Sequence, residues 1–168
     1  MVCGVIMKMI LILLAGLYPN AIAKEKTKVS ICTTNPVYCQ IIKNNPSLDR
    51  KYAMKLSNAI HAVAVLYDIE PKKYAAILAQ ESMYKLNAHN KDSKDYGISQ
   101  INHSTAKAYK FNTKKLTTDL AYSIEAGAIV LADMKRMYAS KEKDWWTRYN
   151  SSNATKRKKY KTLVARYM

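Results

Sequence analysis

An acidic residue on the apolar face of a predicted helix constrains this chain more than any other feature. Helical spacing of i, i+3, i+4 and i+7 connects four residues that follow Pro71: Tyr74, Ile77, Leu78 and Glu81. Such a stripe turns toward a core, so Glu81 is expected to be buried. Burial disfavours the charged form of a carboxylate, and a carboxyl that stays protonated near neutral pH can act as a general acid. The stripe therefore predicts a helical fold that holds an acid beside a cleft.

A polar loop separates this helix from a glycine turn. Residues 95–102 read Asp-Tyr-Gly-Ile-Ser-Gln-Ile-Asn. Gly97 suits a turn, and the alternation of polar and apolar residues after it is typical of a short strand or an extended stretch. Because this segment follows Glu81 closely, the two pieces together indicate a cleft enzyme that protonates a leaving group.

The remaining apolar patterns predict more helices within one domain that spans residues 51–168. Helices are expected over the ranges 52–67, 71–82, 104–109, 120–134 and 145–167, the last of them broken near 150–153. Ser104 is the expected cap of the third helix, and 116–119 is expected to be a connector. Gly127 lies within the stripe of the fourth helix, where it costs about 1 kcal/mol relative to Ala. A close approach of another backbone would explain that glycine.

The charge balance is strongly basic. The 168 residues include 28 Lys and Arg against 12 Asp and Glu, a formal net charge of +16. Such an excess favours polyanionic partners, among them nucleic acid, anionic lipid surfaces and acidic cell-wall polymers. The cluster Lys156-Arg157-Lys158-Lys159 leaves open a basic binding module without chemistry, or a solvated helix face.

The first 23 residues have the pattern of a signal peptide. Lys8 supplies a positive n-region, residues 10–17 an apolar h-region, and Ala21-Ile22-Ala23 a small-x-small cleavage pattern. The apolar run is shorter than the roughly 20 residues that a membrane span needs, so no stable span is expected after cleavage. A retained anchor and a true start at Met7 are the alternatives. The pattern predicts export.

The cysteines fit an oxidising compartment. Cleavage after Ala23 would remove Cys3 and leave Cys32 and Cys39, seven positions apart, in a polar leader expected to be irregular over residues 24–50. Two such cysteines in an exported chain suit one local disulfide, with two free thiols as the alternative. The histidines have no metal-ligand spacing, so no metal site is expected.

Four sequence blocks resemble the lytic transglycosylases of the soluble SLT type, a lysozyme-like family. In chain order, the blocks are Glu81-Ser82, the Gly-Ile-Ser-Gln-Ile of 97–101, the helix segment 123–131, and the Arg-Tyr-Asn-Ser-Ser of 148–152 followed by Arg157-x-x-Tyr160. The last feature is similar to small, specialised members. The resemblance implies a mainly α, lysozyme-like α+β domain with a small extended or β element near 95–102. Three positions depart from the family pattern: Ser99 for Met, Ser123 for Asn and Ser152 for Gly.

The resemblance also implies a reaction. Glu81 would donate a proton to the glycosidic oxygen between MurNAc and GlcNAc in peptidoglycan, and would then take a proton from the sugar's own C6 hydroxyl, which closes on C1 to give a 1,6-anhydro end. No cofactor is implied. The expected substrate-binding residues are Ser82, Ser99, Gln100, Tyr149 and Asn150. The hydroxyl of Tyr149 is expected to hold the Glu81 carboxyl and to tune its pKa.

Asp95 leaves a hydrolytic alternative open. C-type lysozymes carry a similar stretch, Glu-Ser followed by Asp-Tyr-Gly-Ile-x-Gln-Ile-Asn, in which the Asp is the second carboxylate of a retaining hydrolase. The small number of cysteines and the block around Tyr149 favour the transglycosylase. We therefore interpret Asp95 as a turn-capping or cleft-lining residue, since Asp before a glycine turn is common turn chemistry.

The size of similar family members suggests a setting for the chain. The expected partner is the peptidoglycan glycan strand in the periplasm or cell envelope, and nucleic acid is not expected. Small exported transglycosylases without a wall-binding domain often serve a secretion or conjugation apparatus. A general wall-remodelling role or a phage-encoded one is equally compatible with these residues.

Overall fold

The computed structural model describes residues 32–168, so the predicted signal peptide lies outside the described residues. Along the chain the elements are α3 (Pro36–Asn44), α4 (Arg50–Leu66), α5 (Pro71–Ser82), β1 (His89–Asn90), β2 (Asp95–Tyr96), β3 (Ile101–Asn102), α6 (His103–Ala108), α7 (Thr113–Thr118), α8 (Leu120–Tyr138), the 3-10 helix η1 (Trp145–Tyr149) and α9 (Ala154–Ala165). This is the mainly α fold with a small β element that the resemblance implies. None of the helices within 32–168 has the length and apolarity that crossing a bilayer would require.

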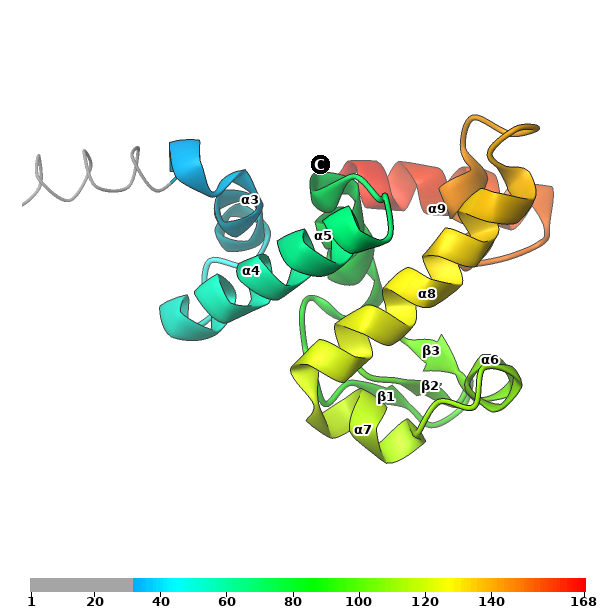
Figure 1. The fold of residues 1–168 in the computed structure, drawn as a ribbon, viewed down its shortest axis with the longest axis horizontal. Coiled ribbons are helices and arrows are strands. Elements are labelled where there is room, and N and C mark those ends of the chain that lie inside the picture. The colour runs from blue at the N-terminus through cyan, green and yellow to red at the C-terminus, as the bar shows by residue number, and fades with distance from the viewer. Residues whose placement is uncertain (1–31) are drawn as a thin grey trace, which may run out of the picture. The chain divides into compact units, whose positions relative to one another are not determined.

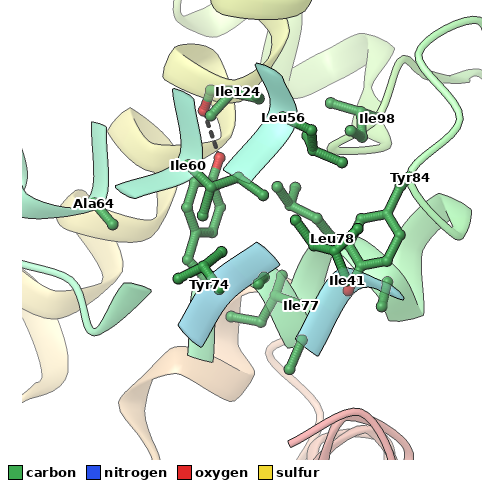
Figure 2. Close-up of a cluster of buried hydrophobic side chains, with 14 of the residues drawn as sticks. Ile41, Leu56, Ile60, Ala64, Tyr74, Ile77, Leu78, Tyr84, Ile98 and Ile124 are labelled. Atoms are coloured by element: carbon green, nitrogen blue, oxygen red, sulfur yellow. Dashed lines mark hydrogen bonds between the residues drawn. The ribbon is translucent and has the colours of Figure 1, made fainter. Parts of the chain in front are cut away.

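Within residues 37–168, the helices enclose an apolar core beneath the small sheet. The core is built around α5, which buries every residue from Tyr74 to Ala79, and from the apolar faces of α4 and α8; Figure 2 shows how the labelled side chains meet. Leu56, Ile77 and Leu78 are completely buried there. The hydroxyl of Tyr74 donates a hydrogen bond to the backbone oxygen of Ile124, which joins α5 to α8 inside the core. The stripe that contains Glu81 is therefore anchored along its length.

The leader is not irregular throughout, contrary to expectation. Residues 36–44 form α3, which buries Val37 and Ile41 at helical spacing i, i+4. The side-chain amide of Gln40 donates to the backbone oxygens of Lys72 at 2.9 Å and Tyr167 at 2.7 Å. The two breaking Asn-Pro pairs therefore flank a short buried helix, whose apolar face is only two residues long.

Both cysteines of the predicted local disulfide lie within the described residues. Cys32 and Cys39 are each disulfide-bonded, so neither is a free thiol. The pairing of Cys32 with Cys39 stays a prediction.

The sheet has three antiparallel strands in the order β1-β2-β3. In its register Asp95 lies opposite Asn90 on one side and Asn102 on the other. Figure 1 shows the sheet beside α6 and α7, with the long helix α8 running past them toward α9. The extended stretch predicted around Gly97 is thus two short strands, β2 and β3, which a turn connects.

Gly97 makes this turn possible. Its φ is +75°, and a Cβ at this position would lie 1.9 Å from the backbone oxygen of Leu116 and 2.5 Å from the Ser123 hydroxyl. No side chain fits there, so the turn packs directly on α7 and α8. The buried hydroxyl oxygen of Ser123 has no hydrogen-bond partner.

Two local expectations were wrong. The connector predicted at 116–119 belongs largely to α7, whose cap is Asn112. The cap of α6 is Asn102 and not Ser104, because the Asn102 side chain accepts from the backbone N–H of Ser104 at 3.0 Å. In both places an Asn precedes the first residue of the helix and caps it, because its short side chain accepts hydrogen bonds from backbone N–H groups.

Candidate active site

A cleft of about 300 Å³ opens at the C-terminal end of α5. Strands β2 and β3, helices α6 and α8, and the end of η1 form its other walls. Its lining residues are Glu81, Asp95, Gln100, Ile101, Asn102, Thr105, Val130, Tyr149 and Asn150. Five of the nine belong to the segment 95–105, so the small sheet and the start of α6 make up most of one wall.

Glu81 lies at the inner end of this cleft, on the last turn of α5. Its helix stripe leads out of the core, where Tyr74, Ile77 and Leu78 are completely buried. Burial raises the pKa of Glu81 from its usual 4.5 to about 7, and the negative charge of nearby Asp95 adds to the rise, whereas a hydrogen bond from Tyr160 opposes it. This is the direction expected from the apolar stripe. A carboxyl with this pKa holds its proton near neutral pH.

Tyr160, and not Tyr149, holds the Glu81 carboxyl. The Tyr160 hydroxyl donates to Oε1 of Glu81 at 2.5 Å. Tyr160 lies on α9, is only 3% exposed, and has the ring of Trp146 with its centroid 6.1 Å away. The Glu81 carboxyl is therefore held by one hydroxyl donor, which a buried aromatic ring carries. The motif Arg157-x-x-Tyr160 marked this residue in the sequence, but nothing local indicated that α9 returns to the end of α5.

Tyr149 serves the cleft in a different way. Its hydroxyl donates to the backbone oxygen of Ser99 at 2.7 Å, while part of the side chain lines the cleft. The expected hydrogen bond from Tyr149 to Glu81 is therefore wrong. The observed bond ties η1 to the turn after Gly97, which keeps the two walls of the cleft together.

Ser99 does not face the cleft. It is completely buried, and its hydroxyl donates to the backbone oxygen of Ser123 at 2.7 Å. A Cβ added at Gly127 would lie 2.5 Å from the Ser99 hydroxyl and 2.6 Å from that of Tyr74. Gly127 thus admits two side chains and not another backbone, and Ser99 fills the space that the glycine leaves. A substrate-binding side chain at Ser99 is excluded by this burial.

The Ser82 hydroxyl also makes its hydrogen bond within the protein. Its hydroxyl donates to the backbone oxygen of Ile98 at 2.8 Å, and the residue is absent from the cleft lining. The bond joins the end of α5 to the glycine turn. Ser82 therefore positions the turn relative to Glu81, and contact with substrate stays a prediction.

Gln100 and Asn150 lie in the cleft wall, and their contact with substrate stays a prediction. Both line the cleft, Gln100 partly buried and Asn150 exposed. Gln100 has a φ of +45°, and its side-chain amide donates to the backbone oxygen of Gly97 at 2.8 Å. This bond fixes the Gln100 side chain against the turn.

Asp95 lines the same cleft as Glu81, and its carboxylate is held from two sides. The amide of Asn102 donates to Oδ1 at 2.9 Å, and the Ser93 hydroxyl donates to Oδ2. The Asn102 bond follows from the register, which sets the two residues opposite each other. Asp95 therefore combines turn hydrogen bonding with a place in the cleft wall.

Four lining residues were not predicted as site residues: Ile101, Asn102, Thr105 and Val130. Val130 lies three residues after Gly127 on α8, at the edge of the stripe, and Thr105 is in the first turn of α6. Helical periodicity assigns such residues to the border between core and solvent, where they resemble any surface residue. Within residues 32–168, no group of three or more His, Cys, Asp or Glu side chains is arranged to hold a metal ion.

Comparisons with known proteins show the family of this chain. Residues 58–165 match the family model described as "Transglycosylase SLT domain". The chain is 33% identical over 108 residues to "Invasion protein IagB" from Salmonella typhimurium strain SL1344, and equally to the proteins of that name from strain LT2 and from Salmonella typhi. These matches cover 61% of this chain and 65% of each relative, a little under two thirds of the relative's length. No solved structure matches. The family match covers more than half of the chain and includes both Glu81 and Tyr160, so the chain belongs to the transglycosylase SLT domain family.

Proposed function

We propose that this chain is a peptidoglycan lytic transglycosylase that cleaves the β-1,4 bond between MurNAc and GlcNAc and leaves a 1,6-anhydroMurNAc end. The observation that carries the proposal is the environment of Glu81: a partly buried carboxyl in a cleft, with a pKa near 7 and a tyrosine donor on one oxygen. A general acid works best when its pKa lies near the operating pH.

Glu81 would act twice in this reaction. The protonated carboxyl first gives its proton to the glycosidic oxygen, so that the C1–O bond breaks and positive charge develops at C1. Glu81 is then a carboxylate, which the Tyr160 hydroxyl stabilises at 2.5 Å. The carboxylate takes the proton of the C6 hydroxyl as that oxygen bonds to C1. The carboxyl regains its proton, and no water is consumed.

One carboxyl suffices for this sequence of steps because the substrate supplies its own nucleophile. Hydrolysis with Asp95 as the second carboxylate is the other candidate, and the observation in its favour is that Asp95 and Glu81 line one cleft. Against it, both oxygens of Asp95 already accept hydrogen bonds from Asn102 and Ser93. These bonds hold Asp95 in the cleft wall, and the match to the transglycosylase SLT domain makes the transglycosylase the better supported reaction.

The masses of the released sugars test this proposal. Purified peptidoglycan is incubated with the protein, and the products are measured by mass spectrometry beside those of the Asp95→Asn variant. We expect products lighter by one water than the hydrolytic ones, from both proteins. Reducing-end products that disappear in Asp95→Asn would establish the hydrolase. Sedimentation with the wall without any release would favour a non-catalytic basic module.

Removing the Tyr160 hydroxyl should change the pH profile as well as the rate. The hydrogen bond lowers the pKa of Glu81, so in Tyr160→Phe that pKa should rise above its present value of about 7. Glu81 must be protonated to begin the reaction, so the alkaline limb of kcat/KM should move to higher pH while kcat falls by about tenfold. Initial rates on purified glycan strands across the pH range measure both effects.

Tyr109→Phe is the matched control for this experiment. Tyr109 donates to a carboxylate oxygen of Asp133 at 2.6 Å, outside the cleft. Its pH profile should coincide with that of the unmodified protein. An unmoved alkaline limb in Tyr160→Phe would contradict the assignment of Tyr160 as the residue that tunes Glu81.

The setting we propose is the cell wall, outside the cytoplasmic membrane. The predicted signal peptide and the wall polymer that the family acts on support an exported protein in the periplasm or cell envelope. The relatives with the printed name "Invasion protein" support the proposal that the chain opens the wall for a secretion or conjugation apparatus.

A further inference from the structure

A second pocket lies apart from the cleft residues, between the segment after α8 and helix α9. Its volume is about 450 Å³. The lining residues are Glu142, Lys143, Asp144, Thr147, Ala154, Arg157, Lys158 and Lys161. On α9 the spacing from Ala154 through Arg157 and Lys158 to Lys161 is i, i+3, i+4 and i+7, so one continuous face of this helix forms the wall.

The walls of the pocket carry an excess of two positive charges, because four cationic side chains face two carboxylates. Both carboxylates are already paired. Asp144 accepts from Lys161 at 2.5 Å, and Glu142 is shared between Arg148 and Arg157.

Lys143 and Lys158 have no ion-pair partner among residues 32–168, and both are exposed at the pocket. Their charge is not neutralised by the protein. The pocket therefore has two lysine charges that no carboxylate within residues 32–168 neutralises, because Glu142 and Asp144 are paired with other cations.

Arg157 and Thr147 are the remaining polar residues of the pocket. Nη1 of Arg157 is buried and makes no hydrogen bond, although it lies 3.4 Å from Oε2 of Glu142. The hydroxyl of Thr147 already donates a hydrogen bond to the backbone oxygen of Asp144 at 2.7 Å. Nη1 is shielded from solvent, so the two exposed lysines are the groups that a ligand can reach, and a negatively charged oxygen is the ligand that suits them.

We propose that this pocket binds a carboxylate of the peptide stems that peptidoglycan glycan strands carry. The proposal rests on the proposed function, since it takes peptidoglycan as the substrate. The two elements that line the pocket also serve the cleft: η1 holds Thr147 in one and Tyr149 in the other, and α9 carries Tyr160 between Arg157 and Lys161. The two sites are thus built on the same two elements, and the proposal places the stems of a strand bound in the cleft at this pocket.

The number of unpaired cations favours a stem carboxylate over a nucleic acid. A polynucleotide is bound along a basic groove that contacts several successive phosphates. Here, among residues 32–168, only Lys143 and Lys158 line the pocket without an ion-pair partner, which suits a single anionic group. The other α9 lysines, Lys156 and Lys159, are exposed and do not line it.

Calorimetry with a soluble stem tripeptide that ends in diaminopimelate tests the pocket directly. The test variant combines Lys143→Gln with Lys158→Gln, and the matched control combines Lys156→Gln with Lys159→Gln, which removes the same charge from the same helix. We expect the test variant to bind the tripeptide about tenfold more weakly than the unmodified protein and the control within about twofold of it. If both variants bind the tripeptide equally weakly, the loss of affinity comes from the lower net charge of the protein, and the proposal is overturned.

Turnover on two substrates gives a second measurement. On intact glycan strands the KM of the test variant should rise about tenfold with kcat unchanged, because the lost contact is made equally in the ground state and the transition state. On strands freed of their peptides by an amidase, the test variant should match the unmodified protein. The same loss on both substrates would overturn the assignment to the stems.

The two failures can be told apart. If the unmodified protein cleaves neither substrate, the proposed function fails, while the tripeptide titration still decides the pocket. Inorganic phosphate that displaces the tripeptide at equal concentration would overturn the choice of a carboxylate ligand.

Discussion

Glu81→Gln should lower the rate of glycan cleavage by roughly 100- to 10,000-fold, the range that a positioned general acid supplies. The amide has no proton to give to the glycosidic oxygen and cannot take one from the C6 hydroxyl. The Tyr160 hydroxyl can still donate to the amide oxygen in the place where it now meets Oε1, so the cleft should keep its shape. Single-turnover rates on purified strands measure the loss, and co-sedimentation with the wall should show undiminished binding.

Glu125→Gln is the matched control for this loss. Glu125 is an exposed acid on α8 that accepts a hydrogen bond from Tyr67 at 3.1 Å, and it does not line the cleft. Its rate should equal that of the unmodified protein. Cleavage that survives in Glu81→Gln would remove Glu81 from the reaction and leave the cleft without its acid.

The same pair of variants tests the cost of holding Glu81 in its site. The folded pKa of about 7 exceeds the ordinary 4.5, so the folded state binds this proton more tightly than the unfolded state. The free energy of unfolding should therefore fall as pH rises between these two values, by about 3 kcal/mol in total. Gln does not titrate, so the Glu81→Gln variant should not lose this part of the free energy of unfolding as pH rises. Urea unfolding should find it more stable than Glu125→Gln above pH 7, with the difference disappearing below pH 4.5.

Gly97→Ala should destabilise the protein by about 3 kcal/mol or more, since it combines overpacking with a left-handed backbone. The new Cβ would lie 1.9 Å from the backbone oxygen of Leu116, at a φ of +75°. Relief requires the turn to move away from α7. The turn positions Gln100 through the bond to the Gly97 backbone oxygen, so activity should fall as well. Urea unfolding followed by circular dichroism measures the loss of stability.

Asn87→Ala provides the comparison for Gly97→Ala. Asn87 is exposed in the loop between α5 and β1, and its replacement should change the free energy of unfolding by no more than about 0.5 kcal/mol. An Ala at position 97 that is tolerated equally well would mean that the turn has room to shift, and that the close packing of Gly97 on α7 is not needed for stability.

Local sequence patterns were sufficient for the acid and its helix. The stripe through Tyr74, Ile77 and Leu78 placed Glu81 at the edge of the core, and the raised pKa follows from that position. Pro71 begins α5, and Asp119 caps α8 by accepting from the backbone N–H of Tyr122. These features depend on neighbours within a turn or two of helix, which periodicity and capping rules describe directly.

Short segments were harder to predict because their signals are weak. Helix α3 has only two residues of core face, Val37 and Ile41, and α7 buries only Leu116. Neither offers the three or four apolar positions that reveal an amphipathic helix. Their helical state depends on what packs against them.

The partner of the acid was decided by the tertiary structure. Tyr149 and Tyr160 both belong to the sequence block that begins at Arg148. Only the path of α9 brings Tyr160 to Glu81, while η1 directs Tyr149 to Ser99. Ser99 likewise reads as an outward polar residue, yet the missing side chain of Gly127 leaves room for it inside the core. Periodicity assigns a residue to a face of its own element. Which distant element covers that face depends on how the helices pack, and that packing decided the donor to Glu81, the burial of Ser99 and the basic pocket beside α9.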